Sequence, residues 1–346
     1  MTRRYLFLCP DRTSASGGIA VIYDAVALLN KSGYNAAVVH NGPGAGYPDY
    51  PEPVPMFYTR EVWQTYWRHA GPKAKLKMVR ERVASGARKL QPLDLRSTDV
   101  IVAPEFQLAE AIEAFKGFSV VVFVQNPFAL MMSYQRAVQR GMPPQSHVKY
   151  WLGIADVCRT HMKMLGLEPN AIFPVTMKPH EFPFQEEKQR LITYMPRKRP
   201  WEAAVISEAL VRRNRVFDYR IEALDNMPRS EVAAKLAQSR FFISLLQHEA
   251  LGFPAAEAMA SGCIVIGFDG LGTAEYFDNT VGIPVTEGDV ASVVESVELA
   301  VAEYETDPTR FDAMRSIASK RVNERYSVEA FKTRLLDAWK KMDMHL

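Results

Sequence analysis

Cysteine is scarce in this sequence: Cys9, Cys158 and Cys263 lie far apart, and none belongs to a C-x-x-C pair. Neither a disulfide framework nor a zinc site is expected from this spacing, and a reducing, cytoplasmic compartment fits it best. A large excess of charge of one sign is also lacking, because 42 basic residues against 39 acidic residues leave a net charge of +3. We therefore expect no general role in nucleic-acid binding.

Long apolar runs are absent too. The N-terminal stretch MTRRYLFLCPDR contains only the short run YLFLC, which is too short for a signal sequence or a membrane span. Low-complexity segments and solenoid periods are also missing. What the chain does have is 346 residues, of which 48% are hydrophobic. This length and apolar content are sufficient for two globular domains.

Short apolar runs alternate with helical patterns along the first half of the chain. The run DVIVAP precedes the helical pattern EFQLAEAIEAFKG, and SVVVFVQ precedes FALMMSYQRAVQRG. Strands that are apolar almost throughout are typical of parallel sheets covered on both faces, with the helices as right-handed crossovers. The pattern predicts an α/β, doubly wound fold.

Residues 175–190 carry two prolines and a charge cluster without a clear period, which is typical of a linker. A new alternation of strands and helices then begins, followed by helical patterns near 289–304, 308–324 and 328–343. The sequence therefore predicts two Rossmann-like domains, over 1–178 and 190–327, with a cleft between them and a further helix over 328–346.

The stretch HEALGFPAAEAMASGCIVIGFDGLGTAEYF, residues 248–277, places Glu249 in a loop after an apolar strand and Glu257 in the first turn of the next helix. Ligands of open parallel sheets bind at the carboxyl ends of strands, where loops lead into helix N-termini. Carboxylates bind diols well, and backbone N–H groups at Gly252 and Phe253 suit an anion or a hydroxyl group. Pro254 is expected as the first helical residue. The alternative is that Glu257 only complements the helix dipole and Glu249 is solvated.

This stretch resembles the most recognisable segment of the family 4 glycosyltransferases, which are retaining enzymes of the GT-B fold. The shared features are two glutamates separated by seven residues, Gly252, the string EAMASG before an apolar strand, and Gly272 followed by Glu275. Weaker similarity extends over about half of the chain. The resemblance implies that Glu257 binds the ribose of a nucleotide-sugar donor and Glu249 the transferred sugar. The amides from Gly252 to Pro254 would contact sugar or phosphate.

The resemblance also assigns roles to the two domains and to two further loops. Residues 1–178 would be the acceptor side, 190–327 would bind the nucleotide sugar, and the helix over 328–346 would pack back on the first domain. Gly17 and Gly18, in SASGGIAV, would approach the donor phosphates, although such a pair alone is more often a tight turn.

The basic string YMPRKRP, residues 194–200, follows the first strand of the second domain. The family usually has an Arg and a Lys five residues apart here, whereas this chain has three adjacent cations. We favour Arg197 and Lys198 over Arg199 as the groups that neutralise the leaving diphosphate. The alternative is a solvated basic turn.

The first domain departs from the family at a second position. Many members carry a histidine near the sugar where this chain has Gln125 and Asn126. Asn126 is the candidate at this place, where an amide would hold the sugar or the acceptor. His40 and His161 are alternatives, although a lone histidine at a strand end is more often a polar cap.

Metal chemistry is not expected. The sequence has no D-x-D motif, and its aspartates and histidines do not cluster at ligand spacing. We therefore expect no metal and no cofactor, with the nucleotide-diphosphate sugar as a substrate.

The stretch over residues 67–90 is strongly basic, with Glu81 its only acid. Lys73, Lys77, Arg80 and Arg88 would share one helical face, which suits anionic lipid headgroups at the inner membrane surface or a phosphorylated acceptor. A solvated face over a packed one is an equal alternative.

The resemblance thus implies a metal-independent, retaining glycosyltransferase of polysaccharide biosynthesis that transfers sugar to a glycan, lipid-linked or small-molecule acceptor. Two alternatives stay open, a nucleotide-sugar-binding protein that has lost catalysis and a GT-B sugar-nucleotide epimerase. Release of nucleoside diphosphate from the donor separates a transferase from a binding protein.

Overall fold

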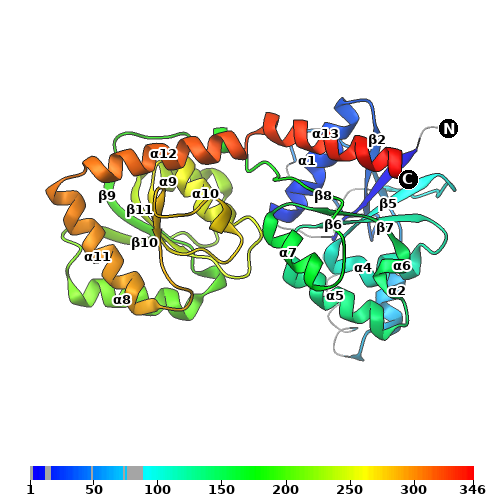
Figure 1. Cartoon of the computed structure of the whole chain (residues 1–346), viewed down its shortest axis with the longest axis horizontal. Helices are drawn as coiled ribbons and strands as arrows, with labels where there is room; N and C mark the ends of the chain where they lie inside the picture. The colour runs from blue at the N-terminus through cyan, green and yellow to red at the C-terminus, as the bar shows by residue number, and fades with distance from the viewer. Residues whose placement is uncertain (1–2, 12–16, 48–49, 73–74, 76–88) are drawn as a thin grey trace. The chain divides into compact units, whose positions relative to one another are not determined.

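The computed structural model describes residues 3–11, 17–47, 50–72, 75 and 89–346. Contacts divide the chain into two compact units (Figure 1). Unit 1 comprises residues 1–173 and 332–346, and unit 2 comprises residues 174–331. Each unit is an α/β domain around a parallel sheet, so the predicted pair of Rossmann-like, doubly wound α/β domains is present.

Within the described residues, the sheet of unit 1 has eight strands in the order β4-β3-β2-β1-β5-β6-β7-β8. The order reverses at β1 and β5, which are neighbours although three strands separate them in the chain. Every pairing in this sheet is parallel. The strands are β1 (Arg4–Leu8), β2 (Asn35–His40), β3 (Met56–Tyr58), β4 (Gln91–Pro92), β5 (Asp99–Pro104), β6 (Ser119–Val124), β7 (Val148–Gly153) and β8 (Ala171–Ile172).

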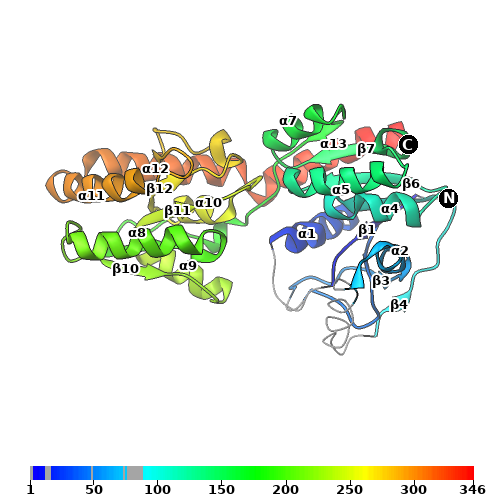
Figure 2. The same cartoon turned by 90° about the horizontal axis from the view of Figure 1, so that it is seen from below.

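Helices cover both faces of this sheet because its strands are apolar on both sides. Helices α1 and α13 lie on the opposite side of the sheet from α4 and α5 (Figures 1 and 2). The described helices of unit 1 are α1 (Gly17–Lys31), α2 (Glu61–His69), η1 (Glu105–Gln107), α4 (Leu108–Ala114), α5 (Pro127–Gln139), α6 (Pro144–His147), α7 (Asp156–Met164) and most of α13 (Val328–His345).

Unit 2 has a five-stranded parallel sheet in the order β10-β9-β11-β12-β13. Its strands are β9 (Gln189–Tyr194), β10 (Arg220–Ala223), β11 (Ser239–Leu245), β12 (Ile264–Phe268) and β13 (Gly282–Pro284). Its described helices are η2 (Pro179–Glu181), η3 (Pro196–Lys198), α8 (Pro200–Arg213), α9 (Arg229–Gln238), α10 (Phe253–Ala260), η4 (Thr273–Glu275), α11 (Val290–Thr306) and α12 (Thr309–Arg325).

The helices of unit 2 form two layers. Figure 1 shows α8 and α11 along one side of the sheet and α9, α10 and α12 along the other. Side chains of α8 and α11 meet the apolar residues of β9, β11 and β12 in one continuous core, which includes Ile206, Phe241, Ile266 and Val297. The loops that follow β9, β11 and β12 are left at the carboxyl edge of the sheet.

The C-terminal helix α13 returns the chain to unit 1. Trp339 is fully buried, with its ring stacked on Phe7 at 5.4 Å and edge-on to Tyr5 at 5.5 Å. Asp343 accepts hydrogen bonds from Arg3, at 2.7 Å, and from the Tyr5 hydroxyl. The buried contact of Trp339 with Tyr5 and Phe7 therefore holds α13 against β1.

We expect Asp343→Asn to lower the free energy of unfolding of unit 1 by about 1–2 kcal/mol, because it weakens a charge-assisted pair at the α13–β1 contact. Asp337→Asn is the matched control. Asp337 lies on the same helix and pairs with the exposed Lys341 at 2.7 Å, so its loss should cost less than about 0.5 kcal/mol. Urea denaturation of both variants measures the difference, and equal effects would contradict the docking role of Asp343.

Candidate functional site

The carboxyl edge of unit 2 brings two predicted site residues together. The sheet order reverses between β9 and β11, which are adjacent although β10 lies between them in the chain. Lys198 lies in η3 just after β9, and Glu249 lies in the loop after β11. Lys198 Nζ is 3.1 Å from Glu249 Oε1, and both side chains are partly exposed. A switch point of this kind is where open parallel sheets bind their ligands.

The three adjacent cations of the basic string differ in environment. Arg199 is buried, donates to the Leu246 carbonyl at 3.0 Å, pairs with Glu287, and lies over the Phe268 ring at 4.7 Å. Arg197 and Lys198 are exposed. Arg199 therefore holds the strand ends together, and the other two cations are accessible to an anion.

The loop that carries Glu249 is tightly constrained. The Glu249 N–H donates to the Gly270 carbonyl at 3.1 Å. Gly252 has φ +67°, and a Cβ there would lie 2.2 Å from Thr273 Cγ2 and 2.7 Å from Leu246 Cδ1. Only glycine satisfies both the left-handed backbone and this close approach.

Helix α10 starts directly after Gly252. Its first residue is Phe253, so the expectation that Pro254 begins the helix is wrong by one residue. The left-handed Gly252 ends the loop, and its carbonyl accepts the N–H groups of Ala255 and Ala256 at 3.2 and 3.4 Å. The N–H groups at Gly252 and Phe253 precede these bonds, which is the usual position of anion-binding amides.

Glu257 lies on α10 and is 5% exposed. Its Oε1 accepts a hydrogen bond from Arg229 Nη1 at 2.5 Å. Burial raises the pKa of Glu257 to about 7, and the Arg229 charge opposes this rise. A buried carboxylate beside one cation is a strong acceptor for hydroxyl groups when it is ionised.

The Tyr276 side chain lies among the acidic groups of this edge. Its hydroxyl donates to the carbonyls of Leu251 and Gly252 at 3.0 and 2.9 Å. Burial raises the pKa of Tyr276 well above its ordinary value, and the charges of Glu249 and Glu257 contribute in the same direction. Both glutamates thus lie within electrostatic range of one tyrosine.

The carboxyl edge of unit 1 brings a second pair of loops together. Gly17 and Gly18 begin α1 and are exposed. A Cβ on Gly18 would lie 3.2 Å from Gln125 Oε1, so the start of α1 reaches the loop after β6. Asn126 caps α5, because its side-chain oxygen accepts the N–H groups of Phe128 and Ala129 at 2.9 and 3.2 Å.

The two histidine alternatives have different surroundings. His40 is buried at the end of β2, with Nε2 2.8 Å from the Tyr23 hydroxyl and Nδ1 3.3 Å from Asp11 Oδ1. His161 Nδ1 lies 2.9 Å from the Val157 carbonyl oxygen, and its ring meets the Phe128 ring at 5.0 Å. Both rings therefore have structural partners in unit 1.

Sequence reasoning missed three residues at these edges, Arg229, Glu105 and Asp11. Glu105 is buried and accepts the Gln125 N–H at 2.9 Å; burial raises its pKa to about 7. Each of the three acts on a group 20 or more residues away in the chain. No local pattern identifies such a contact, although the position of Glu105 directly after β5 is a usable signal.

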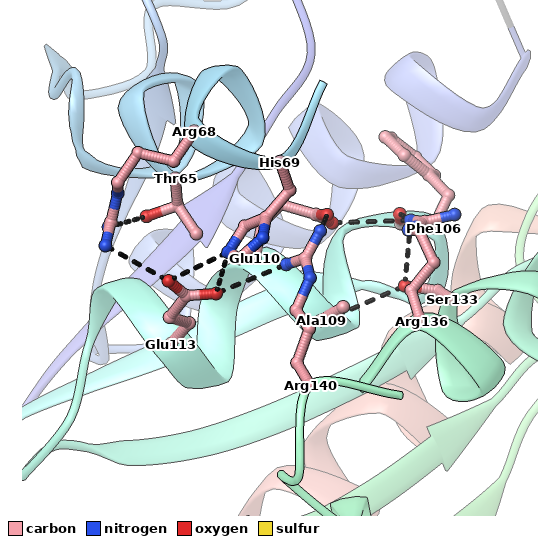
Figure 3. A network of polar contacts seen from close by, with 10 residues as sticks. All are labelled: Thr65, Arg68, His69, Phe106, Ala109, Glu110, Glu113, Ser133, Arg136 and Arg140. Atoms are coloured by element: carbon pink, nitrogen blue, oxygen red, sulfur yellow. Dashed lines mark hydrogen bonds and ion pairs between the residues drawn. The ribbon is translucent and has the colours of Figure 1, made fainter. Parts of the chain in front are cut away.

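Helix α2 leads into the basic stretch 67–90, and ion pairs join it to Glu113 of α4, which also pairs with Arg140 at the end of α5 (Figure 3). The Glu113 carboxylate forms ion pairs with Arg68 at 3.1 Å and with Arg140 at 3.3 Å. His69 Nε2 lies 2.9 Å from the same carboxylate. Arg140 also pairs with the buried Glu110 at 2.9 Å. The start of the basic stretch is thereby fixed on unit 1.

Aromatic rings of α2 lie at and just before the start of this stretch. Trp63 and Trp67 stack at 5.1 Å, and Lys75 Nζ lies 5.5 Å from the Trp67 ring centroid. The predicted basic face consists of Lys73, Lys77, Arg80 and Arg88, and these four residues lie outside the described part of the chain.

Nowhere in the described ranges do three His, Cys, Asp or Glu side chains cluster in a way that would hold a metal ion. Among the same residues, no helix has the length and apolarity needed to cross a membrane.

Known proteins resemble this chain in sequence and in fold. Residues 219–314 match the family described as glycosyl transferases group 1, and this range contains Arg229, Glu249 and Glu257. The chain is also 26% identical over 233 residues to an α-1,6-glucosyltransferase of Actinobacillus pleuropneumoniae serotype 7 (strain AP76), covering 62% of this chain and 67% of that protein.

Solved structures with low sequence identity share the fold. A mutant of S. aureus TarM, in complex with fondaparinux, α-GlcNAc-glycerol and UDP, has a TM-score of 0.65 at 10% identity over 99% of both chains. Anabaena HepE in complex with UDP has a TM-score of 0.65 at 13% identity over 98% of this chain and 100% of that one.

The fold and the matched segment define a class of protein, the GT-B glycosyltransferases. This chain is a glycosyltransferase.

Proposed function

We propose that this glycosyltransferase moves a sugar from a nucleotide-diphosphate donor to a glycan, lipid-linked or small-molecule acceptor, with retention of anomeric configuration. UDP-glucose is the first candidate donor. The similar chain from A. pleuropneumoniae is described as a glucosyltransferase, and Anabaena HepE was solved with UDP-glucose. The observation that carries the proposal is the Lys198–Glu249 pair, 3.1 Å apart at the switch point of the unit 2 sheet.

Each predicted site residue has a role in this proposal. Glu249 accepts hydrogen bonds from the hydroxyl groups of the transferred sugar, and Glu257 accepts those of the ribose. Gly17 and Gly18 approach the phosphates, and Asn126 holds sugar or acceptor. The amides at Gly252, Phe253 and Pro254 mark the start of α10, where the helix dipole favours sugar or phosphate contacts.

In the proposed reaction, the bond between the sugar C1 and the β-phosphate oxygen breaks as the acceptor oxygen bonds to the same face of C1. The electron pair stays on the diphosphate, which also receives the acceptor proton. Arg197 and Lys198 stabilise the charge that grows on the leaving diphosphate. The reaction needs no metal and no cofactor in this proposal.

Turnover of nucleotide sugars tests the proposal. The chain is incubated with UDP-, GDP-, dTDP- and ADP-glucose, and release of nucleoside diphosphate is measured with water or an added glycan as acceptor. We expect slow release of UDP from UDP-glucose, and a product with the anomeric configuration of the donor by NMR. A protein that only binds nucleotide sugars would return the donor intact, and an epimerase would convert it to an isomeric nucleotide sugar.

The proposal includes peripheral contact of residues 67–90 with anionic membranes. The stacked Trp63 and Trp67 and the nearby Lys75 support it, because aromatic and basic side chains favour the interface. Sedimentation with vesicles of phosphatidylglycerol at low salt tests it; a chain that stays in the supernatant has no such contact.

A further inference from the structure

Arg229 begins helix α9 and connects the buried Glu257 to the first segment of unit 2. Its side chain is half-exposed, whereas that of Glu257 is 6% exposed. Nη1 donates to Glu257 Oε1 at 2.5 Å, Nε donates to Glu181 Oε2 at 2.6 Å, and Nη2 donates to the Met177 carbonyl at 2.9 Å. The guanidinium also lies over the Phe182 ring, 4.6 Å from its centroid. Three donor nitrogens and one face of this group are therefore engaged.

Glu257 needs a charge to bind a diol well. An ionised carboxylate only accepts hydrogen bonds, so it can take both hydroxyl protons of a ribose, whereas a protonated one must use one oxygen as a donor. Burial favours the protonated form, and a nearby cation opposes this effect. The pKa of Glu257 is raised to about 7 even with Arg229 in contact. The ionised and protonated forms of its carboxyl group are therefore about equally populated near neutral pH.

We propose that Arg229 is a positioning residue that keeps the Glu257 carboxylate charged and oriented for the ribose of the donor. This inference rests on the proposed function, because it assumes that Glu257 binds that ribose. Arg229 itself acts through Glu257 and need not touch the donor.

The other groups around Glu257 are consistent with this role. Among the described residues, the ionisable groups that interact with its carboxyl are Arg229 on α9, Glu181 in η2 and Tyr276 after η4. Glu181 is a like charge and disfavours the ionised form, while Tyr276 is neutral because burial raises its pKa. Arg229 is thus the cation of this group, and it is shared between the two carboxylates.

The contacts of Arg229 also fix its own position. Met177 and Glu181 lie in the segment where the chain enters unit 2. The Met177 N–H donates to the Tyr326 carbonyl at 3.3 Å, and the Thr176 hydroxyl donates to the same oxygen at 3.0 Å. The guanidinium is therefore held by a segment that is itself anchored beside the end of α12, which suits a group that orients another side chain.

The test is the pH dependence of UDP-glucose binding by the full chain, measured by calorimetry from about pH 5.5 to about pH 9. UDP-glucose is preferred to UDP because its diphosphate has no terminal group that titrates near pH 6. If only ionised Glu257 binds the ribose, affinity should fall about tenfold per pH unit below the pKa of Glu257 and level off above it.

Arg229→Met should raise the midpoint of this profile by about one pH unit, because the charge that favours the ionised form is lost. At pH 7 the affinity should then fall about fivefold, and the two proteins should converge near pH 9. Arg229→Lys should recover part of the shift. Glu257→Gln should bind weakly without this pH dependence, and adding Arg229→Met to it should change nothing further.

Arg213→Met is the matched control, because Arg213 pairs with Glu298 at 2.7 Å at the far end of α8. It should leave the profile unchanged. An Arg229→Met profile with an unaltered midpoint, or an equal loss at every pH, contradicts the inference while leaving the proposed function standing. Absence of UDP-glucose binding by the unaltered chain at every pH contradicts the proposed donor and the inference with it.

Discussion

Lys198→Met is expected to lower kcat for sugar transfer by about 10²–10³-fold, the usual cost of removing one preorganised group that stabilises transition-state charge. Lys198 is a partly exposed cation at the switch point of the unit 2 sheet, paired with Glu249 at 3.1 Å. In the proposed reaction it stabilises the negative charge that grows on the diphosphate. Steady-state kinetics with the donor identified by the turnover screen measure the effect.

The same substitution should leave folding almost unchanged. The Lys198–Glu249 pair is partly exposed, and such pairs contribute about 0–1 kcal/mol to stability. Lys341→Met is the matched control, since it removes an exposed lysine that pairs with Asp337 on α13, and its kcat should equal that of the unaltered chain. If the kcat of Lys198→Met stays within about threefold of the original, Lys198 has no catalytic role.

Gly252→Ala is expected to destabilise unit 2 by about 3 kcal/mol or more, since a left-handed backbone and steric overlap act together. The added Cβ would lie 2.2 Å from Thr273 Cγ2 and 2.7 Å from Leu246 Cδ1. Relief of this overlap moves the loop that carries Glu249 and the start of α10, so donor binding should be lost as well. Thermal unfolding should show a drop of about 6 °C or more.

Gly288→Ala separates the effect of the left-handed backbone from the effect of the steric overlap. Gly288 also has a left-handed backbone, with φ +82°, but nothing lies within 4 Å of an added Cβ. Only the backbone strain remains, at about 1–2 kcal/mol, and donor binding should persist. Should both alanine variants unfold at the same temperature, the close approach at Gly252 would have no energetic consequence and the loop geometry described above would be incorrect.

The sequence predicted the parallel sheets well because apolar strand runs and helical periods are local properties. The closing helices expected near 289–304, 308–324 and 328–343 are present as α11, α12 and α13. Helix α10 begins at Phe253, one residue before the predicted start, directly after Gly252, whose left-handed backbone has no local sequence signal.

The positions of candidate site residues were predictable where charged side chains come shortly after a strand. Glu249, Arg197 and Lys198 come straight after β11 and β9, so their place at the carboxyl edge follows from the parallel topology. Their environments were not predictable. Arg199 differs from its two neighbours in its burial against Phe268, its hydrogen bond to the Leu246 carbonyl and its ion pair with Glu287, all supplied by segments far away in the chain.

The order of residues by itself determined that this chain forms two α/β domains and that an acidic pair follows a strand of the second. Both conclusions need only periodicity and the rule that parallel strands place their ends at one edge. The tertiary structure decided which charges meet. Arg229 lies 28 residues before Glu257 in the chain, yet their side chains are 2.5 Å apart. The approach of α9 to α10 creates that contact, and the packing around α10 buries Glu257 and raises its pKa to about 7.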